Sequence, residues 1–375
     1  MPTQLSHRHH YVPEWYQRRF LHSGATAFNI LDLHPKQFRD NRGVVRGTSA
    51  SILNKGPAAW FFEKNLYSTR VFGTPNDDIE TYLFGAIDRK GRRAIDAFLA
   101  EDWNTVHKTY WQMFEFLDAL RLRTPKGLAF LRAITKSRNH EALLFEMQRL
   151  RKMHCLMWAE GAREILSAED SDAKFIFTDH PVTFFNRHVF PADPAIPPHL
   201  DPLQHWQGTQ TLFPFDSNRL FVMTHYEWAR NPLPKNARKS RTNPRLFDNS
   251  MVWYHDTIRN RSLNAEQVRE VNYILKTRAK QYVAGVKVDD LFPERQLKTR
   301  MWNKLGKFLL PSGYEIAAQV GYTVVGKDDG TFYFQDEFGR RPQSKAEYEV
   351  EVARAKRMEA RLKRLIREHE AKRAK

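Results

Sequence analysis

The sequence predicts an α+β fold: a mainly α-helical bundle with a small β-sheet, followed by a C-terminal β-hairpin and a long basic helix. Three observations predict this architecture. Apolar residues repeat with helical spacing over residues 77–158, short apolar runs follow within residues 174–258, and a turn signal and a helix-capping signal appear in the last quarter. We therefore expect a main α+β domain over residues 1–290 and a C-terminal extension over residues 291–375.

The N-terminal 75 residues contain one clear strand pattern. The segment "TAFNILDL", residues 26–33, is a short and mostly apolar run. Glycine and proline punctuate the stretch that follows it, so we expect irregular structure from there to about residue 75.

Three segments predict the helical part. "NDDIETYLFGAID" opens with Asn76 as an N-cap and has acidic residues in its first turn. "WNTVHKTYWQMFEFLDALRLR", residues 103–123, has an apolar residue at every third or fourth position, and Pro125 suits the first turn of the next helix. "EALLFEMQRLRKMHCLMW", residues 141–158, has the same spacing. We expect these helices to pack as an antiparallel bundle.

The strand-rich part is predicted from short buried runs. "KFIF" (174–177), "TLFPF" (211–215) and "RLFVMTH" (219–225) are mostly apolar and are bounded by proline, aspartate and asparagine. A helix is expected to follow, from about Asn264 to Tyr282.

The C-terminal extension carries two local signals. Asp329-Gly330 lies between two runs of strand-forming residues and predicts a hairpin turn. "SKAE", residues 344–347, is a capping box and predicts the start of a helix that runs almost to the end of the chain.

The net charge of +17 and the sequence pI near 9.8 indicate that the chain meets a polyanion. Such a surplus of positive charge is destabilised by self-repulsion unless an anion offsets it. Nucleic acid, RNA or DNA, is the partner that we expect first and an acidic membrane surface the second, while the alternative is a basic but merely solvated surface. With no signal peptide and no apolar stretch of about 20 residues, we expect a cytoplasmic protein without a transmembrane segment.

Two adjacent histidines, His9 and His10, precede the Pro-bounded aromatic and basic segment "YVPEWYQRRF". Neighbouring residues of an extended segment point to opposite sides, so one histidine is free to enter a pocket while the other faces solvent. Since histidine titrates near neutral pH, either one is a candidate for proton transfer in phosphodiester cleavage. The alternative is a packed N-terminal arm in which the aromatics fill the core and histidine bonds to the backbone.

Asp179 lies where a buried strand is expected to end. It is suited to orient a histidine, to bind a divalent ion, or simply to accept backbone N–H bonds in a turn before Pro181. A metal site of His9 or His10 with Asp179 and His180 is chemically reasonable, since two histidines and one carboxylate suit several divalent ions. A divalent metal is therefore a candidate cofactor.

Arg121 and Arg123 lie at the end of the helix over 103–123. Because they are two positions apart, they diverge by about 200° around the helix axis and do not share one target. One arginine is a candidate phosphate clamp, through its planar guanidinium, while the other caps the helix end or stays solvated.

Two basic segments are candidates for contacts with a nucleic-acid backbone. Arginine, lysine and small polar residues in an exposed loop bind phosphate without reading bases, and arginines spaced by three and four share one stripe of a helix. Aromatic residues around the loop suit the stacking of unpaired bases, which favours RNA or single strands. The candidate nucleic-acid-binding residues are Lys235, Arg238, Lys239, Arg241 and Arg245 in the loop and Arg357, Arg361 and Arg364 in the terminal helix. The alternative for both segments is solvated surface.

Two further polar residues are expected to be structural. His154 lies on an apolar stripe and reads as a core histidine, and Cys155, the only cysteine, reads as a small buried hydrophobe. The sequence also lacks a P-loop, a dinucleotide-binding fingerprint, a nucleophile elbow and a zinc-peptidase motif, which disfavours those enzyme classes.

Several short blocks occur together in a characteristic order. They are "HHYVPEWYQRRF", "LRLRTP", "FTDHPV", "FPFDSNRLFVM" and the late helix that carries Asn272. In this order, over roughly residues 7–285, the chain resembles a bacterial family known as domain of unknown function 4238. It departs from the family at Asp179-His180, where a small residue and an Asp-Asn-Pro-like run are expected. The resemblance implies a shared site of His, Arg and Asp, and it brings no established activity.

Two hypotheses from different classes follow. The first is an enzyme, a nuclease-like phosphodiesterase acting on RNA or DNA, such as a defence or toxin effector. In it His9 or His10 is the acid/base or metal ligand, Asp179 the orienting residue or ligand, and Arg121 or Arg123 the phosphate clamp. The second is a non-catalytic nucleic-acid-binding or interaction protein, in which the basic loop and tail act and the histidine block only packs. A membrane-associated protein is a third option, although the terminal helix has few large apolar residues.

Overall fold

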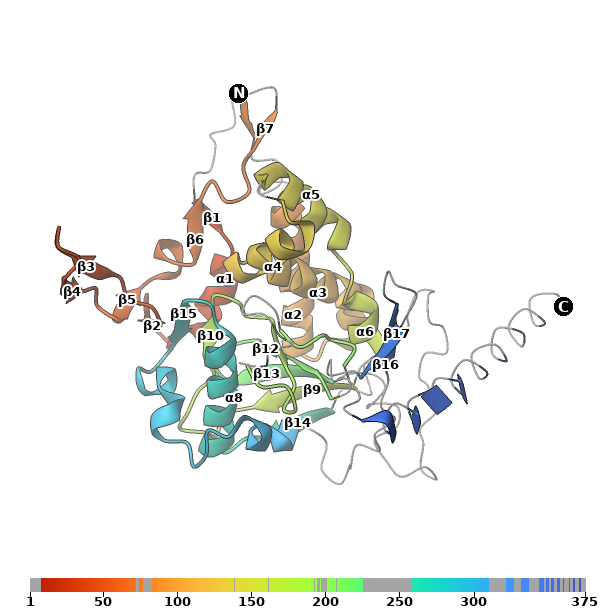
Figure 1. Cartoon of the computed structure of the whole chain (residues 1–375). Coiled ribbons are helices and arrows are strands. Elements are labelled where there is room, and N and C mark those ends of the chain that lie inside the picture. Colours follow the sequence, from red (N-terminus) through yellow and green to blue (C-terminus); the bar gives the residue numbers. More distant parts are fainter. Residues whose placement is uncertain are drawn as a thin grey trace. The chain divides into compact units, whose positions relative to one another are not determined.

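The computed structural model confirms the α+β class and shows a larger β part than the sequence predicted (Figure 1). The residues that the structure describes are 8–71, 74–76, 83–137, 139–160, 162–191, 193, 196, 201–206, 208–224, 258–309, 322–326 and 332–336, with scattered positions from 344 to 371. Their strands form a five-stranded and a four-stranded sheet besides several two-stranded pairs. The structure therefore contains more β-structure than the single small sheet that the sequence predicted. The chain divides into two compact units, Met1–Ala317 and Ala318–Lys375.

The helices between residues 85 and 160 follow the predicted order, and Figure 1 draws them in orange to yellow. They are α2 (Gly85–Leu99), α3 (Trp103–Arg123), α4 (Pro125–Thr135), α5 (His140–Leu150) and α6 (Cys155–Glu160). Helix α3 has the bounds that its apolar spacing predicted, and Asp102 caps it by accepting from the Thr105 N–H.

Two helix predictions need correction. The single helix expected over 141–158 is interrupted between α5 and α6, because Arg151 has non-helical angles and Lys152 adopts a left-handed φ of 77°. Asn76 does not begin a helix: it ends a short strand, β8 (Thr74–Asn76), and the next described helix is α2.

The larger sheet has the strand order β11-β12-β13-β9-β14. All neighbours are antiparallel except β14 and β9, which are parallel. The strands are β11 (Thr183–Phe185), β12 (Gln210–Pro214), β13 (Arg219–Thr224), β9 (Ala162–Ser167) and β14 (Ile258–Ser262). Strands β12 and β13 confirm the predictions at 211–215 and 219–225, whereas β9 and β14 were not predicted.

The second sheet is antiparallel, with the order β10-β15-β2-β5. Its strands are β10 (Phe177–Thr178), β15 (Tyr282–Gly285), β2 (Phe28–Asp32) and β5 (Ile52–Lys55). Strand β2 confirms the prediction at 26–33, while only the last residue of "KFIF" is strand. Helix α8 (Ala265–Arg278) packs beside β10 and β11, begins at a capping box of Asn264 and Gln267, and ends before β15.

The stretch expected to be irregular holds several short strands. These are β3 (Gln37–Arg39) with β4 (Val45–Thr48), β6 (Phe62–Lys64) with the N-terminal β1 (Arg8–His10), and β7 (Thr69–Val71) with β8. Strands of three or four residues are too short to show a two-residue apolar period, so the sequence pattern could not predict them.

The N-terminal segment packs into the main core, as the packed-arm alternative expected. Tyr16, on helix α1 (Glu14–Gln17), donates its hydroxyl to the Pro214 carbonyl oxygen at 2.8 Å. Phe20 packs on Phe177 of β10, with ring centroids 4.6 Å apart. The segment "YVPEWYQRRF" therefore connects both sheets.

The main unit extends past the boundary near residue 290. Trp302, Leu305 and Leu309 are buried in the same core cluster as Val268 and Ile274 of α8, so residues up to at least 309 belong to this core. None of the helices in the described residues combines the length and apolar character needed to cross a membrane.

In the second unit, β16 (Tyr322–Gly326) and β17 (Phe332–Asp336) pair in antiparallel orientation, which confirms the predicted hairpin. Its turn at Asp329-Gly330 lies outside the described residues, as does much of the terminal helix.

Packing of α2 against α3 yields the first prediction. A Cβ at Gly91 would lie 2.4 Å from Cγ of Phe116, so Gly91→Ala should lower the free energy of unfolding by about 1–3 kcal/mol. Lys90→Ala, exposed on the same helix, is the matched control and should change it by less than about 0.5 kcal/mol. Urea unfolding measures both; equal stabilities of the two variants would contradict this packing.

Candidate functional site

Polar and charged side chains from four separate segments converge on the carboxylate of Asp201. Lys126 Nζ lies 2.5 Å from Asp201 Oδ1, while Arg121 Nη2 and His180 Nε2 lie 3.4 Å and 3.3 Å from Oδ2. With Arg278, these residues form a group that we call the cationic cluster. All five side chains are buried.

The turn between α3 and α4 positions two members of the cationic cluster. Thr124 follows α3 and caps α4, since its Oγ1 accepts from the Gly127 N–H at 3.2 Å. A Cβ at Gly127 would lie 2.2 Å from the Arg121 carbonyl oxygen, so only glycine allows this close turn. Arg121 and Lys126, on either side of the turn, therefore reach the same carboxylate.

His180 is held in place by the preceding residue, Asp179, and by Thr124. It directly follows Asp179, whose carboxylate accepts the backbone N–H groups of Lys280, Gln281 and Tyr282 at 2.6–3.1 Å. Its Nδ1 lies 2.7 Å from Thr124 Oγ1.

The two ring nitrogens of His180 face Thr124 and Asp201. The single proton of the Thr124 hydroxyl can go either to the Arg121 carbonyl oxygen at 3.1 Å or to His180 Nδ1 at 2.7 Å. The His180 Nε2 atom lies 3.3 Å from Asp201 Oδ2.

Aromatic rings hold the two arginines of the cluster. The Arg121 guanidinium carbon lies 4.2 Å from the centre of the Phe184 ring, and that of Arg278 lies 5.2 Å from the Trp302 ring. Arg278 ends α8, and its carbonyl oxygen accepts from Lys126 Nζ at 2.9 Å. The guanidinium planes are thereby held in place, and Arg121 Nε and Arg278 Nε have no hydrogen-bond partner among the described residues.

Positive charge exceeds negative charge in this buried group. Three cations, Arg121, Lys126 and Arg278, are near Asp201. Lys126 also acts on Asp179, whose carboxylate is already bonded to backbone N–H groups. Burial lowers the pKa of Lys126, against the opposing effect of Asp201, and burial also lowers the pKa of Arg278. Both lowered pKa values indicate that nearby negative charge compensates the positive charges of Lys126 and Arg278 only in part.

The pKa values of His180 and Asp201 respond to the same surroundings. Burial lowers the pKa of His180 to about 4, so the ring is neutral at pH 7. Burial alone would raise the pKa of Asp201, but Lys126, His180 and Arg121 outweigh it and hold that pKa well below its usual range. The site thus combines a neutral histidine, an ionised carboxylate and three cations.

Arg123 points elsewhere, as the predicted divergence of the two arginines requires. Its Nη2 lies 2.9 Å from Asp88 Oδ1 of α2, and its backbone carbonyl accepts the Tyr67 hydroxyl at 2.8 Å. His9 belongs to this second group: its Nδ1 accepts from the Tyr67 N–H at 2.9 Å and its ring stacks on Tyr67. His9 and Arg123 therefore both bond to Tyr67.

The proposed metal-binding set is not assembled. His10 packs on Phe62 and its Nδ1 lies 3.7 Å from Glu14 Oε1, while the Asp179 carboxylate is occupied by the three backbone N–H groups described above. Among the residues that the structure describes, no three His, Cys, Asp or Glu side chains are grouped to hold a metal ion. Of the functions considered for Asp179, this geometry matches acceptance of backbone N–H bonds.

The basic segments are described only in part. The loop residues Lys235, Arg238, Lys239, Arg241 and Arg245, and Arg361 of the terminal helix, lie outside the described residues. Arg357 and Arg364 are described as helical and exposed.

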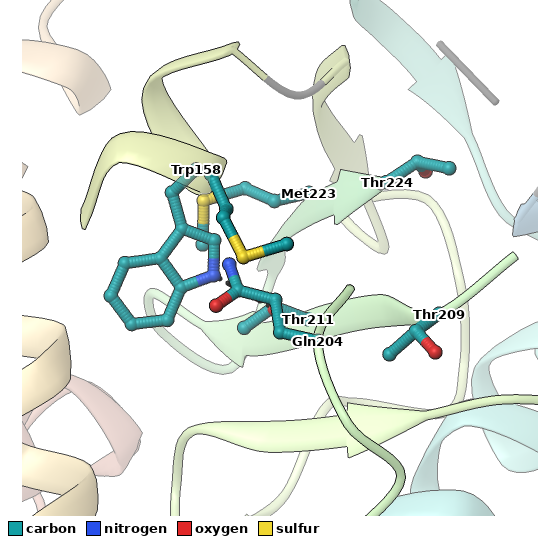
Figure 2. Close-up of a pocket in the computed structure, with 7 residues that line it drawn as sticks. Trp158, Gln204, Thr209, Thr211, Met223 and Thr224 are labelled. Atoms are coloured by element: carbon teal, nitrogen blue, oxygen red, sulfur yellow. Dashed lines mark hydrogen bonds between the residues drawn. The ribbon is translucent and has the colours of Figure 1, made fainter. Parts of the chain in front are cut away.

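His154 is a satisfied core histidine, as predicted, because its Nδ1 lies 2.7 Å from Asp118 Oδ1. Burial raises the pKa of Cys155 well above its usual range, so this thiol stays protonated and is not a nucleophile. Next to His154, Figure 2 shows a pocket lined by Trp158, Gln204 and neighbouring threonine and methionine side chains. Its volume of about 10 Å³ matches one water molecule and no larger ligand.

Sequence reasoning missed four members of this site: Thr124, Lys126, Asp201 and Arg278. One signal was available for the first two, since "TPKG" combines an N-cap, a first-turn proline and a lysine directly after the arginines of "LRLR". Asp201 and Arg278 carry no local signal.

The comparisons with known proteins add one match. The family model described as "Protein of unknown function (DUF4238)" matches residues 8–287, which include every member of the cationic cluster. No curated protein and no solved structure matches the chain.

The lowered pKa of His180 predicts acid sensitivity. Unfolded, this histidine titrates near pH 6.5, whereas folded it titrates at about 4, so between these values the unfolded state binds more protons. His180 should therefore cost about 3 kcal/mol of stability as the pH falls from 7 to 4. Asp201, Lys126 and Arg121, which face His180, keep their charges in this window.

Urea unfolding at several pH values compares wild type with His180→Gln. The variant should lose less stability on acidification, because glutamine does not titrate. His154, whose pKa burial also lowers, contributes equally to both proteins. Parallel pH profiles would show that His180 is not the buried titrating group.

Proposed function

Given that the chain belongs to the DUF4238 family, a family of unknown function, we propose that it is a phosphodiesterase acting on nucleic acid, with the scissile phosphate bound at the cationic cluster. One observation carries the proposal. A buried group of three cations shares a single available carboxylate and leaves guanidinium N–H donors without partners among the described residues.

Buried charge without compensation is costly, so a group of buried cations is a favourable place for an anion. A phosphodiester suits this site, since its two non-bridging oxygens accept from guanidinium and ammonium donors at the spacing that a carboxylate uses. Arg121, Lys126 and Arg278 are the phosphate-binding residues in this proposal. Arg121 keeps the phosphate-clamp role predicted from sequence, whereas His9, His10 and Arg123 take no part.

His180 is the proposed general base. The Nε2 lone pair of His180 takes the proton of the hydroxyl that attacks phosphorus, and the new O–P bond forms. The bond from phosphorus to the leaving oxygen breaks, and its electron pair goes to that oxygen. Lys126, whose pKa burial lowers, then gives a proton to the leaving oxygen. Thr124 is the proposed positioning residue: when its oxygen accepts from the Nδ1–H of His180, the lone pair of the ring lies on Nε2.

The net charge of +17 supports a polyanionic substrate over a small phosphoester. The exposed Arg357 and Arg364 add cations outside the site. The aromatic residues around the basic loop favour RNA or single strands, as argued from the sequence.

The decisive variant is His180→Asn, tested on labelled single-stranded RNA and DNA. Loss of a general base should lower kcat about 10²- to 10⁴-fold while substrate binding stays within a few-fold of wild type. His9→Asn is the matched control, an equally buried histidine outside the cluster, and its kcat per folded molecule should equal that of wild type.

Two outcomes would overturn this assignment. Equal cleavage by wild type and His180→Asn would exclude His180 as the base. Binding without cleavage by the wild type would favour the alternative hypothesis, a non-catalytic nucleic-acid-binding protein.

Replacing Arg121 separates binding from proton transfer. Arg121→Gln should weaken binding of a short single-stranded oligonucleotide about 10-fold or more, since a charge-assisted contact to phosphate is worth about 1.5–3 kcal/mol. Fluorescence anisotropy at a fixed salt concentration measures the dissociation constant of the oligonucleotide. Arg149→Gln, an exposed ion-paired arginine of α5, is the control, and an equal loss in both variants would contradict a specific phosphate site.

A further inference from the structure

We infer that the Asp201 carboxylate occupies the phosphate position in the free protein and is displaced from the cationic cluster when a phosphate binds. This inference rests on the phosphate site of the proposed function and names how that site is regulated. Asp201 would then be a competing internal anion, and its removal would strengthen phosphate binding.

The contacts of Asp201 are those that a bound phosphate would use. Its two oxygens accept from Lys126 and Arg121, one oxygen each. A phosphodiester and a carboxylate each carry one negative charge and two acceptor oxygens, so exchanging them leaves the net charge of the buried site unchanged. The exchange therefore avoids burying an additional charge.

The backbone on which Asp201 lies differs from that of its partners. Arg121 and Arg278 lie at the ends of α3 and α8, Lys126 lies in the first turn of α4, and His180 follows β10. Asp201 belongs to the connection between β11 and β12, and residues 201–203 are neither helix nor strand. Moving Asp201 consequently breaks no helical or sheet hydrogen bond, whereas moving the cations would.

The surroundings of Asp201 agree with this difference. Leu203, two residues away, is 43 % exposed although it is a large apolar residue. Gln204 and Trp206 of the same connection are buried, and Gln204 Nε2 donates to the His154 carbonyl oxygen at a long 3.4 Å. The Asp201 carboxylate itself accepts from Lys126 and Arg121, the charges that a phosphate would bind.

The test is the affinity of inorganic phosphate for Asp201→Asn, measured by calorimetric titration of the full chain. Asparagine keeps the size of the side chain and removes the competing charge, so the variant should bind phosphate at least 10-fold more tightly than wild type. Glu164→Gln is the matched control, because Glu164 is a mostly buried carboxylate paired with Arg261 outside the cluster. Its phosphate affinity should equal that of wild type.

Equal or weaker phosphate binding by Asp201→Asn would overturn the inference, since it would make Asp201 a fixed wall of the site. If this variant does not fold, the wild type still decides. Saturating phosphate should accelerate hydrogen exchange of residues 201–206 and leave α3 and α4 unchanged; unchanged or slower exchange at 201–206 would overturn displacement.

These measurements distinguish failure of the inference from failure of the proposed activity. A gain in phosphate affinity by Asp201→Asn without any cleavage of RNA or DNA by the wild type supports the inference and removes the proposed activity. Cleavage of RNA or DNA by the wild type without a gain in phosphate affinity by Asp201→Asn supports the proposed activity and overturns the inference.

Discussion

The close turn from α3 to α4 is the constraint on which the site depends. Gly127 lets its backbone approach the Arg121 carbonyl, and Thr124 closes the turn by capping α4. Two cations five positions apart are thereby directed to one carboxylate, away from water. His180 then bonds to Thr124, and the end of α8 bonds to Lys126, so the other members of the cationic cluster are placed relative to this turn.

Burial of positive charge links the structure of this site to its proposed chemistry. The protein retains three cations in a region where their charge is poorly solvated, and the pKa values of Lys126 and Arg278, which burial lowers, show the cost. Neutral His180 is the counterpart, because the same surroundings that penalise a further positive charge keep its ring unprotonated at pH 7. The internal carboxylate of Asp201 compensates part of this buried positive charge.

The prediction of individual residues succeeded where geometry follows from local spacing. The divergence of Arg121 and Arg123 follows from two residues of helix, and it separates the cationic cluster from the group of His9 and Tyr67. Prediction failed where a backbone angle interrupts a periodic pattern, as at Lys152, because apolar spacing continues across the break. It also failed for His10 with Asp179 and His180, since no spacing along the chain determines which histidine faces which carboxylate.

The sequence alone determined the α+β class, the bounds of α3, the start of α8 and the family membership of residues 8–287, because periodicity and ordered motifs depend on near neighbours. Only the tertiary structure decided the site. Asp201 lies 80 residues from Arg121 along the chain, and the Arg278 carbonyl lies 152 residues from Lys126. Such contacts between residues far apart in the sequence result from how sheets and helices pack against each other. Packing is determined by the whole core and not by any short segment.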